Sequence, residues 1–148
     1  MSAASRAEFF FAVHGVSSPQ FPERAALILG QDQRSTDDGL LQFQEIMQLS
    51  SSADLVTLSA CDTASVKLQG KEGIDGLAQA FLLAGAKSVV GALWDVDDSA
   101  TDTLMRSFYT HLASGEDKAS ALRHAKLDYL QSLGDRPPGL LGSLHVIG

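Results

Sequence analysis

Two residues in this chain have the types and the placement that covalent catalysis on a carbonyl group requires. His14 follows the apolar run at residues 9–13, and Cys61 follows a second apolar run at residues 55–60. A thiol becomes a strong nucleophile when a nearby base favours the thiolate, and an imidazole can be that base. The pair therefore predicts a cysteine nucleophile, Cys61, activated by His14.

The two apolar runs are predicted to be neighbouring parallel strands. Both have the length of buried strands, and the residues between them include a predicted helix at 38–49. A strand–helix–strand unit gives parallel strands whose C-terminal ends share one edge of the sheet, where open α/β sheets place their sites. We therefore expect His14 and Cys61, which are 47 positions apart (61 − 14), to meet at that edge.

The elements predicted beyond Cys61 complete an α/β pattern in a single domain, residues 1–148. Hydrophobic spacing and glycine stops predict a buried helix at 77–84, a strand at 89–93, helices at 98–113 and 117–133, and a last strand at 144–147. The sheet is expected to be mainly parallel. A small flavodoxin-like ligand binder would share this pattern, but it would leave the coincidence of Cys61 and His14 unexplained.

Composition excludes several classes of partner. Asp and Glu number 18 against 11 Lys and Arg, a net charge of −7, which argues against binding nucleic acid or an anionic membrane. A single cysteine allows no intrachain disulfide, and no apolar run approaches the roughly 18 residues of a membrane span. A cytoplasmic protein is expected.

No cofactor and no metal site are expected. His111, His124 and His145 fall on predicted helices or the tail without ligand spacing, and no second cysteine is present. The glycines around Lys71 lack the spacing of a phosphate-binding loop.

Several short motifs stand in an order that resembles a known family. They are His-Gly at 14–15, Leu-Ser-Ala-Cys-Asp-Thr at 58–63, Gly-Leu-Ala at 76–78, Leu-Trp at 93–94 and Val-Asp-Asp at 96–98. This series, which runs from about residue 9 to residue 125, is similar to the CHAT domain. That family is a bacterial branch of the caspase-like cysteine peptidases and is often joined to tetratricopeptide repeats.

The resemblance implies both a fold and an activity. The fold would be a caspase-like three-layer sandwich that lacks the N-terminal strands of the full family domain, so that the chain is the C-terminal catalytic portion. The activity would be that of a cysteine endopeptidase acting on protein or peptide substrates, with Cys61 as nucleophile and His14 as general base and acid. Backbone N–H groups of Gly15 and Cys61 are expected to form the oxyanion hole.

Acidic residues near the same predicted edge suggest a substrate preference. Asp62, Asp95 and Asp97 are candidates for a pocket that receives Arg or Lys before the scissile bond, as in several caspase-like peptidases. The competing interpretation is that Asp97, Asp98 or Ser99 caps the helix at 98–113 and that Asp62 stabilises a turn.

Beside the flavodoxin-like binder, one further alternative to an active peptidase stays open. Cys61 would then be an inert buried thiol and His14-Gly15 a turn, in a catalytically silent CHAT-like scaffold. In either case the apolar run at 9–11 is expected near an open sheet edge, which tends to pair with another chain. The expected partner is an N-terminal CHAT portion, a repeat-containing protein or a second copy, and the isolated chain is expected to have weak activity without it.

Overall fold

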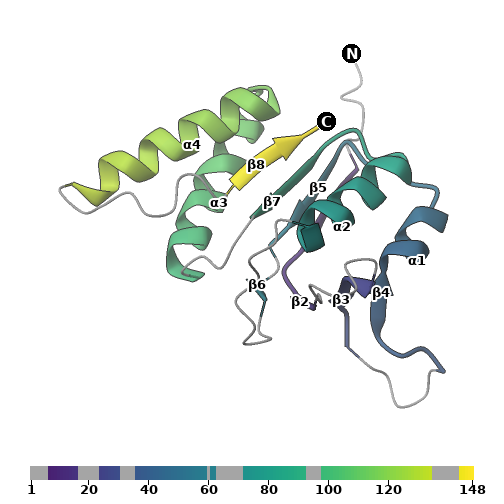
Figure 1. Ribbon diagram of the computed structural model, residues 1–148. Helices are drawn as coiled ribbons and strands as arrows, with labels where there is room; N and C mark the ends of the chain where they lie inside the picture. Colours follow the sequence, from purple (N-terminus) through teal and green to yellow (C-terminus); the bar gives the residue numbers. More distant parts are fainter. Residues whose placement is uncertain are drawn as a thin grey trace.

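The computed structural model (Figure 1) describes residues 7–16, 24–30, 36–59, 61–62, 72–92, 98–134 and 144–148. These residues form an α/β fold with a mainly parallel sheet, as the sequence predicts. The described part contains a main sheet, a small second sheet and four helices.

The main sheet has the strand order β1-β5-β7-β8. Its strands are β1 (Glu8–Phe11), β5 (Leu55–Leu58), β7 (Val89–Ala92) and β8 (Leu144–Ile147). The first three are parallel, and β8 runs antiparallel to β7. All four residues of β5 are buried, as is usual for a parallel strand covered on both faces. The predicted parallel pairing of the first two apolar runs is confirmed.

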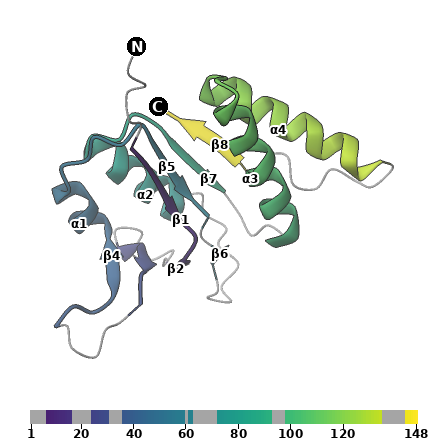
Figure 2. The same ribbon diagram turned by 180° about the vertical axis from the view of Figure 1, so that it is seen from behind.

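Helices pack against both faces of the main sheet (Figures 1 and 2). They are α1 (Phe43–Gln48) and α2 (Glu72–Leu83) on one face, and α3 (Asp98–Ala113) and α4 (Lys118–Leu133) on the other. Because side chains alternate along a strand, Val56 of β5 joins the core under α1 and α2, whereas Leu55 joins the core under α3 and α4. The main sheet therefore lies between the two pairs of helices.

Glycines and one aspartate fix the ends of the helices near the predicted positions. Gly85 follows α2 with φ +108°, and a Cβ there would overlap the Ser51 carbonyl oxygen, so glycine is required. Gly115 has φ +96° in the turn after α3. The Asp117 carboxylate accepts hydrogen bonds of 3.1 Å from the N–H groups of Ala119 and Ser120 and caps α4.

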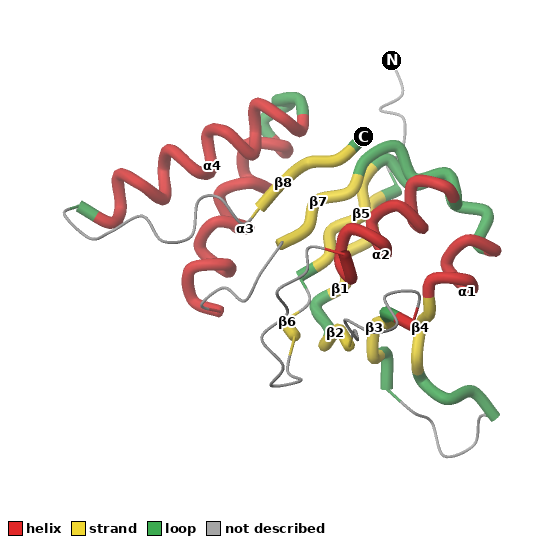
Figure 3. Tube along the Cα trace, viewed as in Figure 1, coloured by secondary structure: helices red, strands yellow, loops and turns green. Residues whose placement is uncertain are grey.

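A small second sheet with the order β4-β3-β2-β6 lies beyond the C-terminal ends of β1 and β5 (Figure 3). Its strands are β2 (His14–Val16), β3 (Ala26–Ile28), β4 (Leu40–Gln42) and β6 (Cys61–Asp62). The predicted helix at 38–49 is wrong in its first part, because residues 40–42 pair with β3 instead. The helix begins only at Phe43, where the side chains of Gln42 and Glu45 form a reciprocal capping box.

Strand β1 lies at one edge of the main sheet as described. Phe9 and Phe10 on it are 50% and 49% exposed, and the Phe10 ring meets the Tyr109 ring edge-on with centroids 6.0 Å apart. No helix in the described part of the chain is long and apolar enough to cross a membrane.

Candidate functional site

The backbone ladder brings His14 and Cys61 to neighbouring positions. In the main sheet Phe11 pairs with Leu58, an offset of 47 (58 − 11), and the Ser59 N–H donates a 2.9 Å hydrogen bond to the Phe11 carbonyl. The chain then leaves the main sheet on both strands, and His14 of β2 pairs in parallel with Cys61 of β6 at the same offset, 61 − 14. One register thus runs through both sheets.

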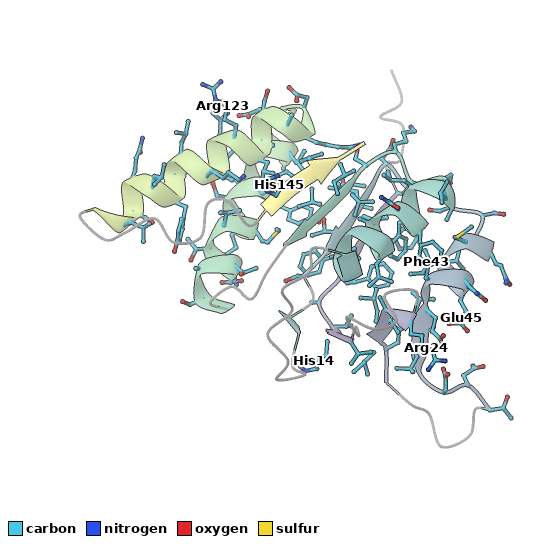
Figure 4. The ribbon with its side chains drawn as sticks, viewed as in Figure 1. His14, Arg24, Phe43, Glu45, Arg123 and His145 are labelled. Atoms are coloured by element: carbon cyan, nitrogen blue, oxygen red, sulfur yellow. The ribbon has the colours of Figure 1, made fainter. Side chains whose placement is uncertain are left out.

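The strands end earlier than the sequence predicts, at Phe11 and Leu58, and the two residues open new strands instead of lying in loops. The reason is the small sheet: on its other side, β2 pairs antiparallel with β3, where His14 is the partner of Ile28. Leu27 of β3 is fully buried and anchors β3, and through it β2, to the core. The His14 side chain is exposed, at the end of the molecule where β2 and β6 lie (Figure 4).

The remaining predicted site residues are only partly placed. Gly15 lies between Leu27 of β3 and Asp62 of β6. The structure places the backbone of Cys61 and Asp62 in β6. Asp95 and Asp97, which were expected to line a substrate pocket, lie outside the described residues.

A second group of polar side chains joins the two helices of the α3–α4 hairpin, and we call it the hairpin cluster: Ser107, His111, Glu116, His124 and Asp128. His111 Nδ1 lies 2.8 Å from Oε1 of Glu116, and His111 Nε2 lies 2.8 Å from Oδ2 of Asp128. The second oxygen of Glu116 lies 2.6 Å from Nδ1 of His124. Ser107 donates a 2.6 Å hydrogen bond to the same Asp128 oxygen.

The carboxylates change the acid–base properties of this cluster. The pKa of His111 is raised, first by its hydrogen bond to Asp128 and then by that to Glu116, because both carboxylates stabilise the imidazolium. The pKa of Glu116 is lowered, mainly by its hydrogen bond with His124. The hydroxyl of Ser107 and the ring of His111 lower the pKa of Asp128. At neutral pH both carboxylates are therefore ionised.

His111 and His124 show no ligand spacing in the sequence, yet the structure brings both side chains to Glu116. They occupy different helices, so no short sequence spacing relates them, but the tight turn between α3 and α4 folds them around Glu116. A usable signal is present in the sequence. Ser107 and His111, like His124 and Asp128, are four residues apart and share one face of a helix. Two such pairs on consecutive helices joined by a four-residue turn are the signal for a polar cluster, although the spacing alone does not define whether the two faces meet.

Comparisons with known proteins agree with the sequence motifs around His14 and Cys61. Residues 6–138 match the CHAT domain. Tetratricopeptide repeat protein 28 of Mus musculus is 36% identical over 93 residues, covering 63% of this chain and 4% of that protein. Tetratricopeptide repeat protein 28 of Homo sapiens is 31% identical over 86 residues, covering 58% of this chain and 3% of that protein. The chain thus spans a small fraction of these relatives, and it belongs to the CHAT domain family.

Proposed function

We propose that this chain is the catalytic portion of a caspase-like cysteine endopeptidase, built as a three-layer α/β sandwich. The observation that carries the proposal is the pairing of His14 with Cys61 across β2 and β6. Adjacent strands lie about 4.8 Å apart, a separation that a thiol and an imidazole side chain on facing positions can bridge. Membership of the CHAT domain family supports the same assignment.

The proposed reaction follows from the two side chains and the nearby backbone. His14 takes the thiol proton, and the Cys61 thiolate attacks the scissile carbonyl carbon. Backbone N–H groups of Gly15 and Cys61 stabilise the negative charge on the carbonyl oxygen. His14 then donates its proton to the leaving amine, which leaves a thioester on Cys61. Water, deprotonated by His14, hydrolyses the thioester and restores the thiol.

We further propose that the enzyme prefers Arg or Lys immediately before the scissile bond. The backbone of Asp62 lies opposite Gly15, one position beyond the pair, which supports a carboxylate beside the site. Asp95 and Asp97 are the other proposed acidic residues of the pocket. The net charge of −7 also favours approach of a basic substrate.

The proposed partners and location follow the family. Both relatives are named for tetratricopeptide repeats, which supports a repeat-containing segment or protein as a partner of this domain. The exposed Phe9 and Phe10 on edge strand β1 support pairing of that edge with an N-terminal CHAT portion or a second copy. The proposed location is the cytoplasm, because the single cysteine needs no oxidising compartment.

A catalytically silent scaffold is the second candidate. The observation that favours it is that both relatives are named for their repeats, and neither name describes a peptidase.

Cleavage of a peptide library distinguishes the two candidates. Cys61→Ala and His14→Ala should each reduce turnover by at least about 10³-fold. The double variant should lose no more turnover than either single variant, because the two residues act as one unit. His145→Ala, which removes an exposed histidine on β8, is the control and should cleave like the parent. Cleavage that survives Cys61→Ala would overturn the peptidase assignment. If the parent neither cleaves nor reacts with an acyloxymethyl-ketone probe, the scaffold is favoured.

A further inference from the structure

The hairpin cluster brings together three potential metal-ligand atoms from three separate segments. One atom each from His111, Glu116 and His124 lies within 4.8 Å of the others. In a tetrahedral zinc site with bonds of about 2.0 Å, neighbouring ligand atoms are about 3.3 Å apart. The Nδ1–oxygen distances of 2.8 and 2.6 Å are shorter than that, so the two rings need to open slightly around the carboxylate to admit a cation.

The surroundings of His111 have the arrangement that metal-binding histidines show. Metal-bound histidines usually donate their second ring N–H to a carboxylate, which fixes the ring and makes the ligating nitrogen more basic. His111 Nε2 makes this contact with Asp128, and Asp128 is held in turn by the Ser107 hydroxyl. The Nδ1 atom of the same ring is the one that faces Glu116.

The charge of the hairpin cluster also suits a divalent cation. A histidine ligates zinc as the neutral imidazole, so the cluster in its ligating form carries the two negative charges of Glu116 and Asp128, which one divalent ion balances. The cluster adjoins the C-terminal end of α3, where helix carbonyls add negative partial charge. The Lys118 ammonium makes its hydrogen bonds to the Asp54 carbonyl and the Ser88 hydroxyl rather than to the carboxylates of the cluster.

Solvent reaches the hairpin cluster, so a metal ion has a way in. The side chains of His111, Glu116 and His124 are 25%, 27% and 45% exposed. Glu116 also lines a surface hollow of about 370 Å³ between the hairpin turn and Asp54. A site on this face can keep one position for water.

We propose that the hairpin cluster is a zinc site, with Nδ1 of His111, Nδ1 of His124 and the carboxylate of Glu116 as ligands and water in the fourth position. Imidazole and carboxylate together suit zinc better than magnesium or calcium, which prefer oxygen ligands alone. Zinc takes the place of the proton on each Nδ1: an imidazolium ring releases that proton to solvent, whereas a neutral ring keeps its single proton on Nε2. Asp128 positions His111 through Nε2. The ion would join α3 and α4 at their shared turn, separate from Cys61 and His14.

Zinc binding is tested on the full chain, free of any histidine tag, in a Cys61→Ala background so that the thiol supplies no ligand. After chelation and dialysis, titration of zinc against a chromophoric chelator should show one site per chain. Asp128→Asn should lower the zinc affinity by about 10- to 100-fold. Glu116→Gln and His124→Ala should lower it further. His145→Ala, outside the hairpin cluster, should bind like its parent.

Two further measurements keep the test decisive. Cobalt bound in place of zinc should give the visible absorption of a tetrahedral site, and Glu116→Gln should remove it. Circular dichroism checks that each variant keeps its helices. Where a ligand variant has unfolded, the zinc affinity of Asp128→Asn decides the outcome instead. Absence of saturable zinc binding, or binding that neither Glu116→Gln nor Asp128→Asn weakens, would overturn the proposal and make the cluster an ion-pair lock between the helices.

Discussion

The His14–Cys61 pair and the hairpin cluster assemble by different means. The pair is placed by backbone pairing, since one register of 47 runs from β1 and β5 into β2 and β6. The hairpin cluster is placed by helical spacing, with Ser107 and His111 on α3 facing His124 and Asp128 on α4. A ladder determines neighbours residue by residue, whereas helices determine them only once their relative rotation is fixed.

The two regions therefore depend on different parts of the core. The His14–Cys61 pair depends on the fully buried β5 and on Leu27 of β3. The hairpin cluster depends on the apolar face that α3 and α4 turn toward Leu55 and Val90 of the main sheet. Substitutions in and between these cores should therefore show which contacts each region depends on.

The largest effect is expected from Phe108→Ala, which empties the core under the hairpin. Phe108 is fully buried and its ring packs edge-on against Tyr109, with centroids 5.3 Å apart. The free energy of unfolding should fall by about 3–5 kcal/mol in urea denaturation. Leu130→Ala, at a site 37% exposed on α4, is the matched control and should change it by less than about 1 kcal/mol. Equal effects would mean that the hairpin does not depend on this core.

An intermediate effect is expected at a hydrogen bond that joins the two regions. Oγ1 of Thr57, fully buried on β5, lies 2.8 Å from the Tyr109 hydroxyl on α3, and burial raises the pKa of Tyr109, so the phenol stays protonated at neutral pH. Tyr109→Phe should lower the free energy of unfolding by about 1–3 kcal/mol, because the Thr57 hydroxyl loses its partner.

The double variant Thr57→Val with Tyr109→Phe should recover much of that loss, since both polar groups are then gone. A double-mutant cycle by urea denaturation measures the coupling. If the two changes simply add, the hydrogen bond does not couple β5 to the hairpin.

The smallest effect is expected from the exposed pair of Arg106 and Asp102 on the outer face of α3. Arg106 Nε lies 2.8 Å from Asp102 Oδ2, but the side chains are 78% and 60% exposed. Solvent screens such pairs, so Arg106→Gln should leave the melting temperature within about 1 °C of the parent. A drop of several degrees would show that ion pairs on the helix surface, rather than the packed face, hold the hairpin.

Most regular elements, and the meeting of His14 with Cys61, could be predicted from the sequence because they depend on local patterns and on the parallel pairing of two apolar runs. Apolar runs predict β1 and β5, although only β5 is buried as expected and β1 is largely exposed. Asp117 and Gly115 mark the start of α4 and the end of α3. The offset of 47 between His14 and Cys61 then follows from parallel pairing. These features need no knowledge of how distant elements are oriented.

The small sheet and the hairpin cluster could not be predicted in the same way. Strands β3 and β4 have three residues each, too few to show a period, and Leu40 and Leu41 fit a helix as well as a strand. Ladder pairing with Leu27 decides for the strand. The meeting of His111 with His124 depends on the rotation of two packed helices, which single-helix spacing does not define.

The pH dependence of Cys61 alkylation shows directly whether His14 activates the thiol. Cys61 is the only cysteine in the chain, so iodoacetamide labelling in the presence of a chelator reports on this thiol alone. If His14 activates Cys61, the midpoint of the rate profile should lie at least about one pH unit below the value near 8.5 of an ordinary thiol, and His14→Ala should move it back. His145→Ala should leave it unchanged. A midpoint that is the same with and without the His14 imidazole would contradict the account.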